Sequence, residues 1–366
     1  MYCVRLSLAK VAIQHIVESN ASMLELGTSL SDAPRILITR LSAIGDCIHC
    51  TPLVSALRKR YPSAFIGWVT QGGPASLLDG HQDIDTIVKV DKRWLKNPKH
   101  ILRIRRQLRE LRFDIAIDPQ SLTKSSLLGW LSGAAYRIGF SRGQARELSP
   151  WLNNYRVEPR SDHVVDRYLE LLKPLGIETP DVEFSIPRSA TSKKTVDAFL
   201  IRNQLDEFVL LNPGAGWNSK IWPHERYAKI AEHLSQELGL ASVVLWAGDR
   251  ERAWAQQVAE QSPAILAPDT SLPELAELCR RAKFFVGSDT GPMHLAAAVG
   301  TRCVAMFGPT KIEVCGPYGR GHRTLQEFLQ DGTSKERRGD NNAAMRAITV
   351  GAVQAACESL CDNRAA

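Results

Sequence analysis

The feature that most constrains the fold of this chain is a repeated alternation of short, β-branched apolar runs with amphipathic helical stretches. In the first half, such runs lie at residues 35–39, 64–69, 86–90, 114–118 and 137–140. Helical patterns separate most of them. Strands that alternate with helices are typical of βαβ units, so the sequence predicts an α/β fold with mainly parallel sheets.

The same alternation returns after a polar linker near residues 180–192, with apolar runs at 208–211, 242–246, 264–266, 284–286 and 303–307. We therefore expect two doubly wound domains, whose ligands bind beyond the carboxyl ends of the strands, in the cleft between the domains. The expected boundaries are an N-terminal extension at residues 1–33, an N-terminal domain at 34–185, a C-terminal domain at 186–348, and a helix and tail at 349–366.

The balance of charge favours anionic partners. The 366 residues carry a net charge of +7, and such a field attracts phosphates, acidic sugars or an anionic membrane face. We expect no nucleic-acid partner, because the chain has no zinc-finger spacing, basic-zipper pattern or RNA-binding aromatic motif. A membrane span needs about 20 apolar residues, and the sequence has neither such a run nor a secretory signal. It favours a cytoplasmic protein.

The eight cysteines lie mostly inside apolar runs, where a reduced thiol packs as a small hydrophobic side chain. Cys47 and Cys50 form a C-x-x-C pair. A structural zinc site needs about four ligands, which Cys357 and Cys361 would complete only if the two chain ends met. We expect packing at these positions and no bound metal; a metal site and a redox disulfide are the alternatives.

A first candidate motif, Arg-Leu-Ser-Ala-Ile-Gly-Asp at residues 40–46, directly follows the first predicted strand. Gly45 permits a tight turn, which places Asp46 at the carboxyl end of the strand, near the next helix. A carboxylate there can accept a proton from a hydroxyl group, although Asp also commonly caps a helix. Thr51 and Pro52 offer a competing helix start that would free Asp46 for chemistry.

A second motif, at residues 211–223, opens the second domain after its first predicted strand. Its small residues let backbone amides approach a diphosphate, and Lys220 supplies a positive charge to hold it. The order of residues is not that of a Walker A loop. The alternative interpretation is a flexible loop with an exposed lysine.

The third motif, at residues 284–298, contains Ser-Asp-Thr-Gly-Pro-Met-His from Ser288 to His294. A strand ends there, and Pro292 stands where the first residue of a helix is expected. The amides of Thr290 and Gly291, with the positive end of the helix, predict an anion site suited to a diphosphate. His294 is close enough to reach a phosphate oxygen, unless it is a histidine of the core.

A further strand end carries Asp249 and Glu251. Either carboxylate can accept hydrogen bonds from ribose hydroxyls. A capped helix start explains both residues equally well.

Residues 92–112 contain nine Lys or Arg residues. Apolar residues recur at helical spacing on one face of this segment, at Ile101, Ile104, Leu108 and Leu111. Such a helix is usually only a solvated surface. The alternative is a surface that meets an anionic membrane or a lipid-linked acceptor.

Together, the three motifs resemble the bacterial heptosyltransferase family, glycosyltransferase family 9, which adds heptose to the inner core of lipopolysaccharide. The similarity runs from about Arg35 to Gly319. It implies a GT-B architecture of two facing Rossmann-like domains, in which the first holds mainly the acceptor and the second mainly the donor. It also implies inverting transfer from an ADP-activated heptose without a metal ion or other cofactor.

The resemblance also implies roles for single residues. By matching position, Asp46 resembles the general base that deprotonates the acceptor hydroxyl, and Lys220 resembles the diphosphate-binding lysine of the family. Asp249 resembles the acidic residue near the ribose. The contacts to the donor phosphate and sugar are implied at Asp289, Thr290, Gly291 and His294.

The implied partners are a nucleotide-sugar donor and an anionic, lipid-linked saccharide acceptor. Peripheral contact with the inner membrane face is the alternative interpretation of residues 92–112. Two departures from the family pattern bear on the acceptor and the donor sugar: Lys311 stands where the family usually has an acidic residue, and residues 340–344 replace a cysteine-containing segment. A GT-B-like epimerase and a non-catalytic nucleotide-sugar binding protein remain alternatives. A dinucleotide oxidoreductase is disfavoured, since no G-x-G-x-x-G follows a predicted strand.

Overall fold

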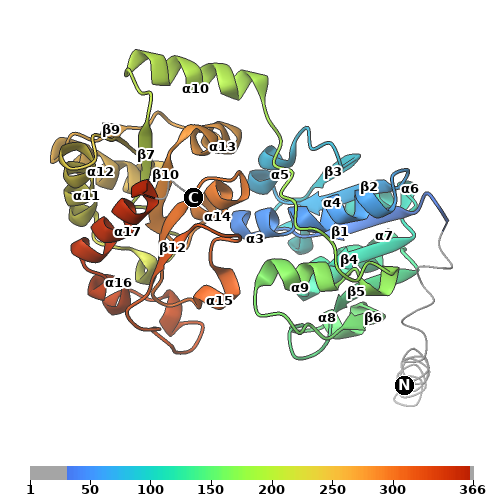
Figure 1. Ribbon diagram of the computed structural model, residues 1–366. Coiled ribbons are helices and arrows are strands. Elements are labelled where there is room, and N and C mark those ends of the chain that lie inside the picture. The colour runs from blue at the N-terminus through green and yellow to red at the C-terminus, as the bar shows by residue number, and fades with distance from the viewer. Residues whose placement is uncertain (1–30, 363–366) are drawn as a thin grey trace. The chain divides into compact units, whose positions relative to one another are not determined.

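The computed structural model describes residues 31–362, so most of the expected extension at residues 1–33 lies outside the described residues. The chain divides into two compact units (Figure 1). Unit 1 extends to Ser161 and includes Val165–Ser185, and unit 2 contains Asp162–Val164 and the chain from Ile186 onward.

Unit 1 is built on a parallel sheet of six strands in the order β3-β2-β1-β4-β5-β6. Its strands are β1 (Arg35–Thr39), β2 (Phe65–Thr70), β3 (Thr86–Lys89), β4 (Ile115–Asp118), β5 (Tyr136–Phe140) and β6 (Tyr155–Val157). The α-helices are α3 (Ile44–His49), α4 (Thr51–Arg60), α5 (Gly72–Leu78), α6 (Pro98–Glu110), α7 (Thr123–Ser132), α8 (Ser149–Leu152) and α9 (Val164–Glu170). Two short 3₁₀ helices are η2 (Trp94–Lys96) and η3 (Lys173–Leu175).

The apolar face predicted for residues 92–112 is the buried face of α6. Ile104 and Leu108 are buried in a core cluster with residues of β1, β2, β4 and α7, and Ile101 and Leu111 pack against it. Burial of these side chains, at roughly 25 cal/mol per Å² of apolar surface, fixes α6 on the sheet. The basic residues of α6 are therefore left on its outer face.

Unit 2 contains a second parallel sheet, in the order β12-β11-β10-β7-β8-β9. Its strands are β7 (Phe208–Asn212), β8 (Ala241–Val244), β9 (Ile265–Leu266), β10 (Phe284–Ser288), β11 (Cys303–Met306) and β12 (Arg323–Leu325). The α-helices are α10 (Ala190–Arg202), α11 (His224–Gln236), α12 (Gly248–Glu260), α13 (Leu272–Arg281), α14 (Gly291–Ala298), α15 (Ile312–Cys315), α16 (Ala343–Ala347) and α17 (Val350–Asp362). Two 3₁₀ helices are η4 (Asn218–Lys220) and η5 (Glu336–Arg338).

The C-terminal helix α17 completes the core of unit 2. Val353, Cys357 and Leu360 are buried in the same cluster as Trp222 and side chains of α11. The Trp222 indole Nε1 donates a hydrogen bond to the carbonyl of Ile348, 3.0 Å away, just before α17. The segment before α11 is thus attached to the segment that leads into α17.

The two sheets confirm the expected α/β fold with parallel strands, and two strands were missed. β6 (Tyr-Arg-Val) and β12 (Arg-Thr-Leu) each have three residues and lie at sheet edges. Each is too short for the alternating or continuous apolar pattern by which the longer strands were identified. A strand at a sheet edge pairs with one neighbour only, so it can be this short and polar.

The structure also bears on the expectations for the cysteines and for membrane spans. The cysteines among them are free thiols, of which Cys47, Cys50, Cys279, Cys303 and Cys357 are buried, as expected for small hydrophobic side chains; Cys3 lies outside the described residues. No helix within residues 31–362 is long and apolar enough to cross a membrane.

In both sheets, the first strand along the chain lies at the centre, and later strands are added first on one side of it and then on the other. In unit 1 the chain moves from β1 to β2 and β3, then returns to β4 on the other side of β1; unit 2 repeats this with β7 and β10. At such a topological switch point the crossovers diverge to opposite faces, and the carboxyl ends of the two central strands are left open to ligands.

Candidate functional site

The first motif follows β1 at the switch point of unit 1. Asp46 is the third residue of α3, and Ala43 is the N-cap. The backbone N–H of Ala43 donates to Asp46 Oδ2 over 3.0 Å, and Arg40 Nη2 lies 2.6 Å from the same oxygen. The carboxylate therefore both closes the first turn of α3 and pairs with a cation.

The expectation that a helix start at Thr51 would free Asp46 from capping is wrong. Two helices form in succession, because Cys50 ends α3 and is also the N-cap of α4. Pro52 fits the first turn of α4, where its missing N–H is not needed. Asp46 thus keeps a capping contact and is still 40% exposed at its side chain.

Only one oxygen of Asp46 is engaged. Both contacts fall on Oδ2, and within residues 31–362 Oδ1 has no hydrogen-bond partner. A half-exposed carboxylate with one unoccupied oxygen can accept the proton of a bound hydroxyl group.

The loop after β4 contributes to the same switch point, and the sequence motifs did not include it. Gln120 Oε1 accepts a hydrogen bond from the N–H of Leu41 over 2.9 Å, and the Pro119 carbonyl accepts one from Arg40 Nη1 over 3.2 Å. The only signal in the sequence was the position of these residues after a predicted strand, since their proximity to residues 40–46 depends on the pairing of β1 with β4.

The second and third motifs meet at the switch point of unit 2, around the buried carboxylate of Asp289. Lys220 Nζ lies 2.6 Å from Asp289 Oδ2, and His294 Nε2 lies 2.9 Å from Oδ1. Thr310 Oγ1 donates to Oδ2 over 2.7 Å. The sequence identified three of these four residues and missed Thr310, which is brought in by the loop after β11.

The charge of Asp289 is strongly stabilised. Burial by itself raises the pKa of a carboxyl group, but the hydrogen bond from His294 and the positive charge of Lys220 outweigh it and hold the pKa of Asp289 well below its usual range. Because an ionised carboxylate only accepts hydrogen bonds, His294 Nε2 is the donor. These contacts suit Asp289 to orient Lys220 and His294, and its own contact with a ligand stays a prediction.

The start of α14 supplies amides to the same switch point. Thr290 is the N-cap, with extended backbone, and Gly291 and Pro292 begin the helix. The Thr290 hydroxyl donates to the Ser288 carbonyl over 3.1 Å, which holds the cap in place. The amides of the first turn have no partners within the helix, so they and the helix dipole can bind an anion.

Of the two acidic residues after β8, Glu251 lies against the second motif. A Cβ atom at Gly214 would stand 2.3 Å from its carboxylate, so a larger residue there would displace the Glu251 side chain. Glu251 Oε2 accepts the N–H of Ala247 over 3.0 Å, and burial raises the pKa of this carboxyl group. Asp249 is exposed and makes no hydrogen bond or ion pair with other described residues.

The lysine of the second motif sits on a segment held by the C-terminal part of the chain. Lys220 ends η4, where Asn218 Nδ2 donates to Asp340 Oδ1 over 2.6 Å. The next carbonyl, of Ile221, accepts a hydrogen bond from Asn342 Nδ2 over 2.9 Å. Residues 340–342 thus support the Lys220 segment.

No group of three or more His, Cys, Asp or Glu side chains within residues 31–362 is arranged to hold a metal ion.

The sequence and fold match known proteins. The family model described as glycosyltransferase family 9 (heptosyltransferase) matches residues 101–343. Lipopolysaccharide heptosyltransferase 1 of Pseudomonas aeruginosa is 30% identical over 303 residues, which cover 78% of this chain and 82% of that protein.

Solved structures agree in fold. A glycosyltransferase of family 9 from Veillonella parvula has a TM-score of 0.77 at 24% identity, covering 91% of this chain and 98% of its own. The Escherichia coli heptosyltransferase WaaC with ADP has a TM-score of 0.73 at 24% identity, covering 89% and 99%. With its two sheets flanked by helices, the chain has the GT-B fold that the motifs implied.

We expect Asp289→Asn to lower the free energy of unfolding by about 3–5 kcal/mol at pH 7, because it leaves the partly buried Lys220 without its counter-charge. The pKa of Asp289 is depressed in the folded state, so this contribution is complete above the unfolded value of about 4 and is lost as the pH falls below it. Urea unfolding of both proteins from pH 3 to 7 measures the difference. Asp331→Asn, at an exposed carboxylate of unit 2, is the control; equal curves for Asp289→Asn and wild type would contradict the assignment.

Proposed function

The chain belongs to glycosyltransferase family 9, the heptosyltransferase family, and we propose that it transfers a heptose from ADP-heptose to the anionic saccharide of a lipopolysaccharide core. The observation that carries the proposal is the set of charged and polar groups that lie at the two switch points. One presents a half-exposed carboxylate, and the other presents a lysine and helix amides. These are the groups that a sugar transfer from a diphosphate requires.

The donor is assigned to unit 2, residues 186–348 with the closing segment 349–366. Lys220 and the amides at Thr290 and Gly291 bind the diphosphate, and His294 reaches one of its oxygens. Asp289 keeps Lys220 and His294 in place. The ribose is assigned to Asp249, with Glu251 beside the loop of the second motif. The E. coli relative solved with ADP supports this nucleotide.

The acceptor is assigned to unit 1, residues 34–185, where Asp46 is the general base. The acceptor oxygen attacks the anomeric carbon from the side opposite the diphosphate, while its proton passes to Asp46 Oδ1. The bond from the anomeric carbon to the phosphate oxygen breaks, and its electron pair leaves with ADP. A single displacement of this kind inverts the anomeric configuration.

Stabilisation of the charge that develops on the leaving diphosphate is assigned to groups of the chain itself. Lys220 and the amides at the start of α14 are fixed before the reaction, so they stabilise the product charge without reorganising. The proposal includes no metal ion and no further cofactor.

We expect Asp46→Asn to lower kcat by about 10² to 10⁴-fold, because an amide of the same shape cannot take the proton. The affinity for ADP-heptose should not change, since Asp46 makes no donor contact. Transfer assays and titration calorimetry measure the two quantities, and Asp79→Asn, at an exposed position of unit 1, is the control. Full turnover by Asp46→Asn would remove Asp46 from the mechanism, and donor conversion without any acceptor would indicate the epimerase alternative.

Lys220→Met should weaken ADP binding by about 10 to 100-fold, which corresponds to the roughly 1.5–3 kcal/mol of a charge-assisted hydrogen bond. Calorimetry with ADP gives the change, and a melting curve shows whether the variant is folded. Lys229→Met, at an exposed lysine on α11, is the matched control. An unchanged affinity would mean that the diphosphate binds elsewhere.

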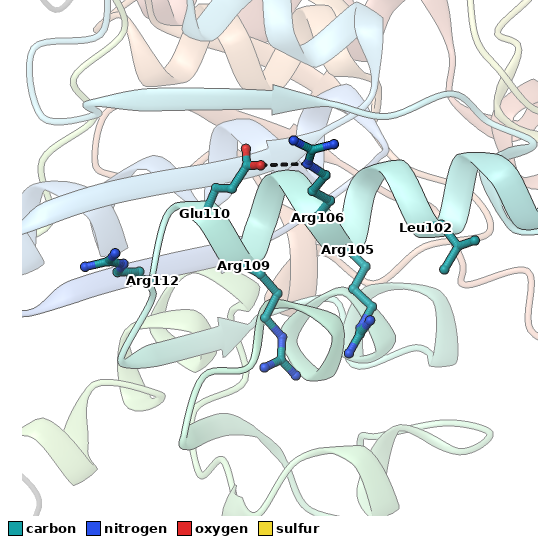
Figure 2. A pocket seen from close by; sticks show the side chains of 6 residues that line it. All are labelled: Leu102, Arg105, Arg106, Arg109, Glu110 and Arg112. Carbon is teal, nitrogen blue, oxygen red and sulfur yellow. Dashed lines mark hydrogen bonds and ion pairs between the residues drawn. The ribbon is translucent and has the colours of Figure 1, made fainter.

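The basic surface of α6 is assigned to contact with the anionic face of the inner membrane, on the cytoplasmic side. Figure 2 shows Leu102, Arg105 and Arg109 projecting from α6, while Arg106 pairs with Glu110 over 2.9 Å. Helix α7 packs against α6, and α8 packs against α7. They add the exposed side chains of Trp130 and Trp151.

Three large apolar side chains on helices α6, α7 and α8 are more than half exposed. Leu102 is 62% exposed, Trp130 52% and Trp151 56%. Arg142 stacks over the Trp151 ring with its Cζ 4.8 Å from the centroid. Indole rings and arginines together are the combination that binds the interface of an anionic bilayer.

Replacing both Trp130 and Trp151 by Ser should reduce binding to phosphatidylglycerol-containing vesicles at least several-fold in co-sedimentation. Transfer to a soluble acceptor fragment should be unchanged, because neither residue lies at a switch point. Ile201→Ser is the control, since Ile201 is 77% exposed but belongs to unit 2. Equal sedimentation of the double variant and wild type would refute the membrane assignment.

A further inference from the structure

Arg40 is a buried cation that the transfer step described above does not use. Its residue is only 6% exposed, between the end of β1 and the start of α3. The backbone is fixed as well, because the Trp68 indole Nε1 donates to the Arg40 carbonyl over 2.9 Å.

The guanidinium is held from three directions. Nη1 donates to the Pro119 carbonyl over 3.2 Å, and Nη2 pairs with Asp46 Oδ2 over 2.6 Å. Its Cζ lies 5.4 Å from the centroid of the Tyr168 ring. The cation is therefore oriented by unit 1 whether or not a substrate is bound.

The group remains charged in this environment. Burial alone would lower the pKa of the Arg40 guanidinium, but attraction to the Asp46 carboxylate outweighs it and raises the pKa above its usual value. The neighbouring thiols are neutral, because burial raises the pKa of Cys47 to about 12 and that of Cys50 well above normal. Asp46 is thus the anion that faces this cation.

Stability alone does not account for Arg40. Its Nε is buried and has no hydrogen-bond partner among the described residues, and an unsatisfied buried donor costs about 1–3 kcal/mol. Moreover, the partner carboxylate is 40% exposed and would be solvated without Arg40. A buried cation that is incompletely bonded and paired with an exposed anion is typical of a functional site.

We propose that Arg40 is the positioning residue for the base: by holding Oδ2 of Asp46 it fixes the carboxylate so that Oδ1 receives the proton of the acceptor hydroxyl. The inference rests on the proposed function of Asp46. Arg40 acts through Asp46 and touches neither substrate.

The proposal predicts that loss of Arg40 lowers kcat and leaves the affinity for the donor unchanged. Losing Arg40 lets the Asp46 carboxylate rotate and take a hydration shell, so fewer encounters have the oxygen aligned for proton transfer. The diphosphate site in unit 2 is not altered. Arg40→Met should lower kcat about 10 to 100-fold, leave the affinity for ADP-heptose unchanged, and leave KM for the acceptor within about threefold.

The experiment compares Arg40→Met, Arg40→Gln and Arg40→Lys in the full chain. Lysine keeps the charge near Oδ2 and should recover most of kcat, whereas glutamine keeps only hydrogen bonding and should not. Glutamine also provides an uncharged variant of similar length if the methionine variant does not fold. The matched control is Arg58→Met, because Arg58 forms a 2.8 Å ion pair with Asp85 in the same unit; it should lose stability and keep kcat.

A double-mutant cycle separates this inference from the proposed function. If Arg40 acts only through Asp46, adding Arg40→Met to Asp46→Asn should not reduce the residual rate further. If Asp46→Asn lowers kcat but Arg40→Met and Arg40→Gln do not, the positioning role is refuted and the base assignment stands. If Asp46→Asn keeps full turnover, Asp46 is not the base, and the positioning role of Arg40 fails with it; absence of transfer by the wild-type chain would instead refute the proposed function. If the lysine variant loses as much kcat and as much melting temperature as the methionine and glutamine variants, Arg40 has a structural role and the inference is overturned.

Discussion

The reversal of strand order beside β1 and beside β7 is the constraint on which both sites depend. At these positions the chain leaves neighbouring parallel strands in opposite directions, so side chains after the strands are not covered by a crossover helix. Loops that are far apart in sequence are brought together there by strand pairing alone. The contact of Pro119 with Arg40 and that of Asp289 with Lys220 both arise in this way.

Each switch point contains an ion pair, and the two pairs differ in which member is more buried. In unit 1 the side chain of the cation Arg40 is 8% exposed and that of its carboxylate partner 40%. In unit 2 the Asp289 side chain is 4% exposed, beneath Lys220 at 14%. The more buried member of each pair holds the more exposed one in place, so in the proposed mechanism unit 1 offers an anion to its ligand and unit 2 a cation. This fits an acceptor hydroxyl in one unit and a diphosphate in the other.

The sequence predicted the architecture well because strand-helix alternation is a local signal that the core enforces. The run at residues 35–39 is β1 without any shift, whereas β6 and β12 were too short to show a period. The motifs containing Asp46, Lys220 and Asp289 were identified because each follows a strand. Their partners Arg40, Thr310 and Gln120 were not assigned as partners, since nothing in their local pattern indicates which loop they meet. The competing helix start at Thr51 misled because two short helices can share one residue, Cys50, as end and cap.

The attachment of η4 to the C-terminal part of unit 2 links the position of Lys220, the proposed diphosphate-binding lysine, to residues that are assigned no contact with the nucleotide. Asp340 and Asn342 hold Asn218 and Ile221 on either side of Lys220, and Trp222 is anchored to Ile348 ahead of α17. Loss of the contacts made by residues 340–348 would therefore release the Lys220 loop into a broader range of conformations. If Lys220 binds the diphosphate as proposed, donor affinity would then fall through an entropic cost, although every group assigned to the phosphates was still present.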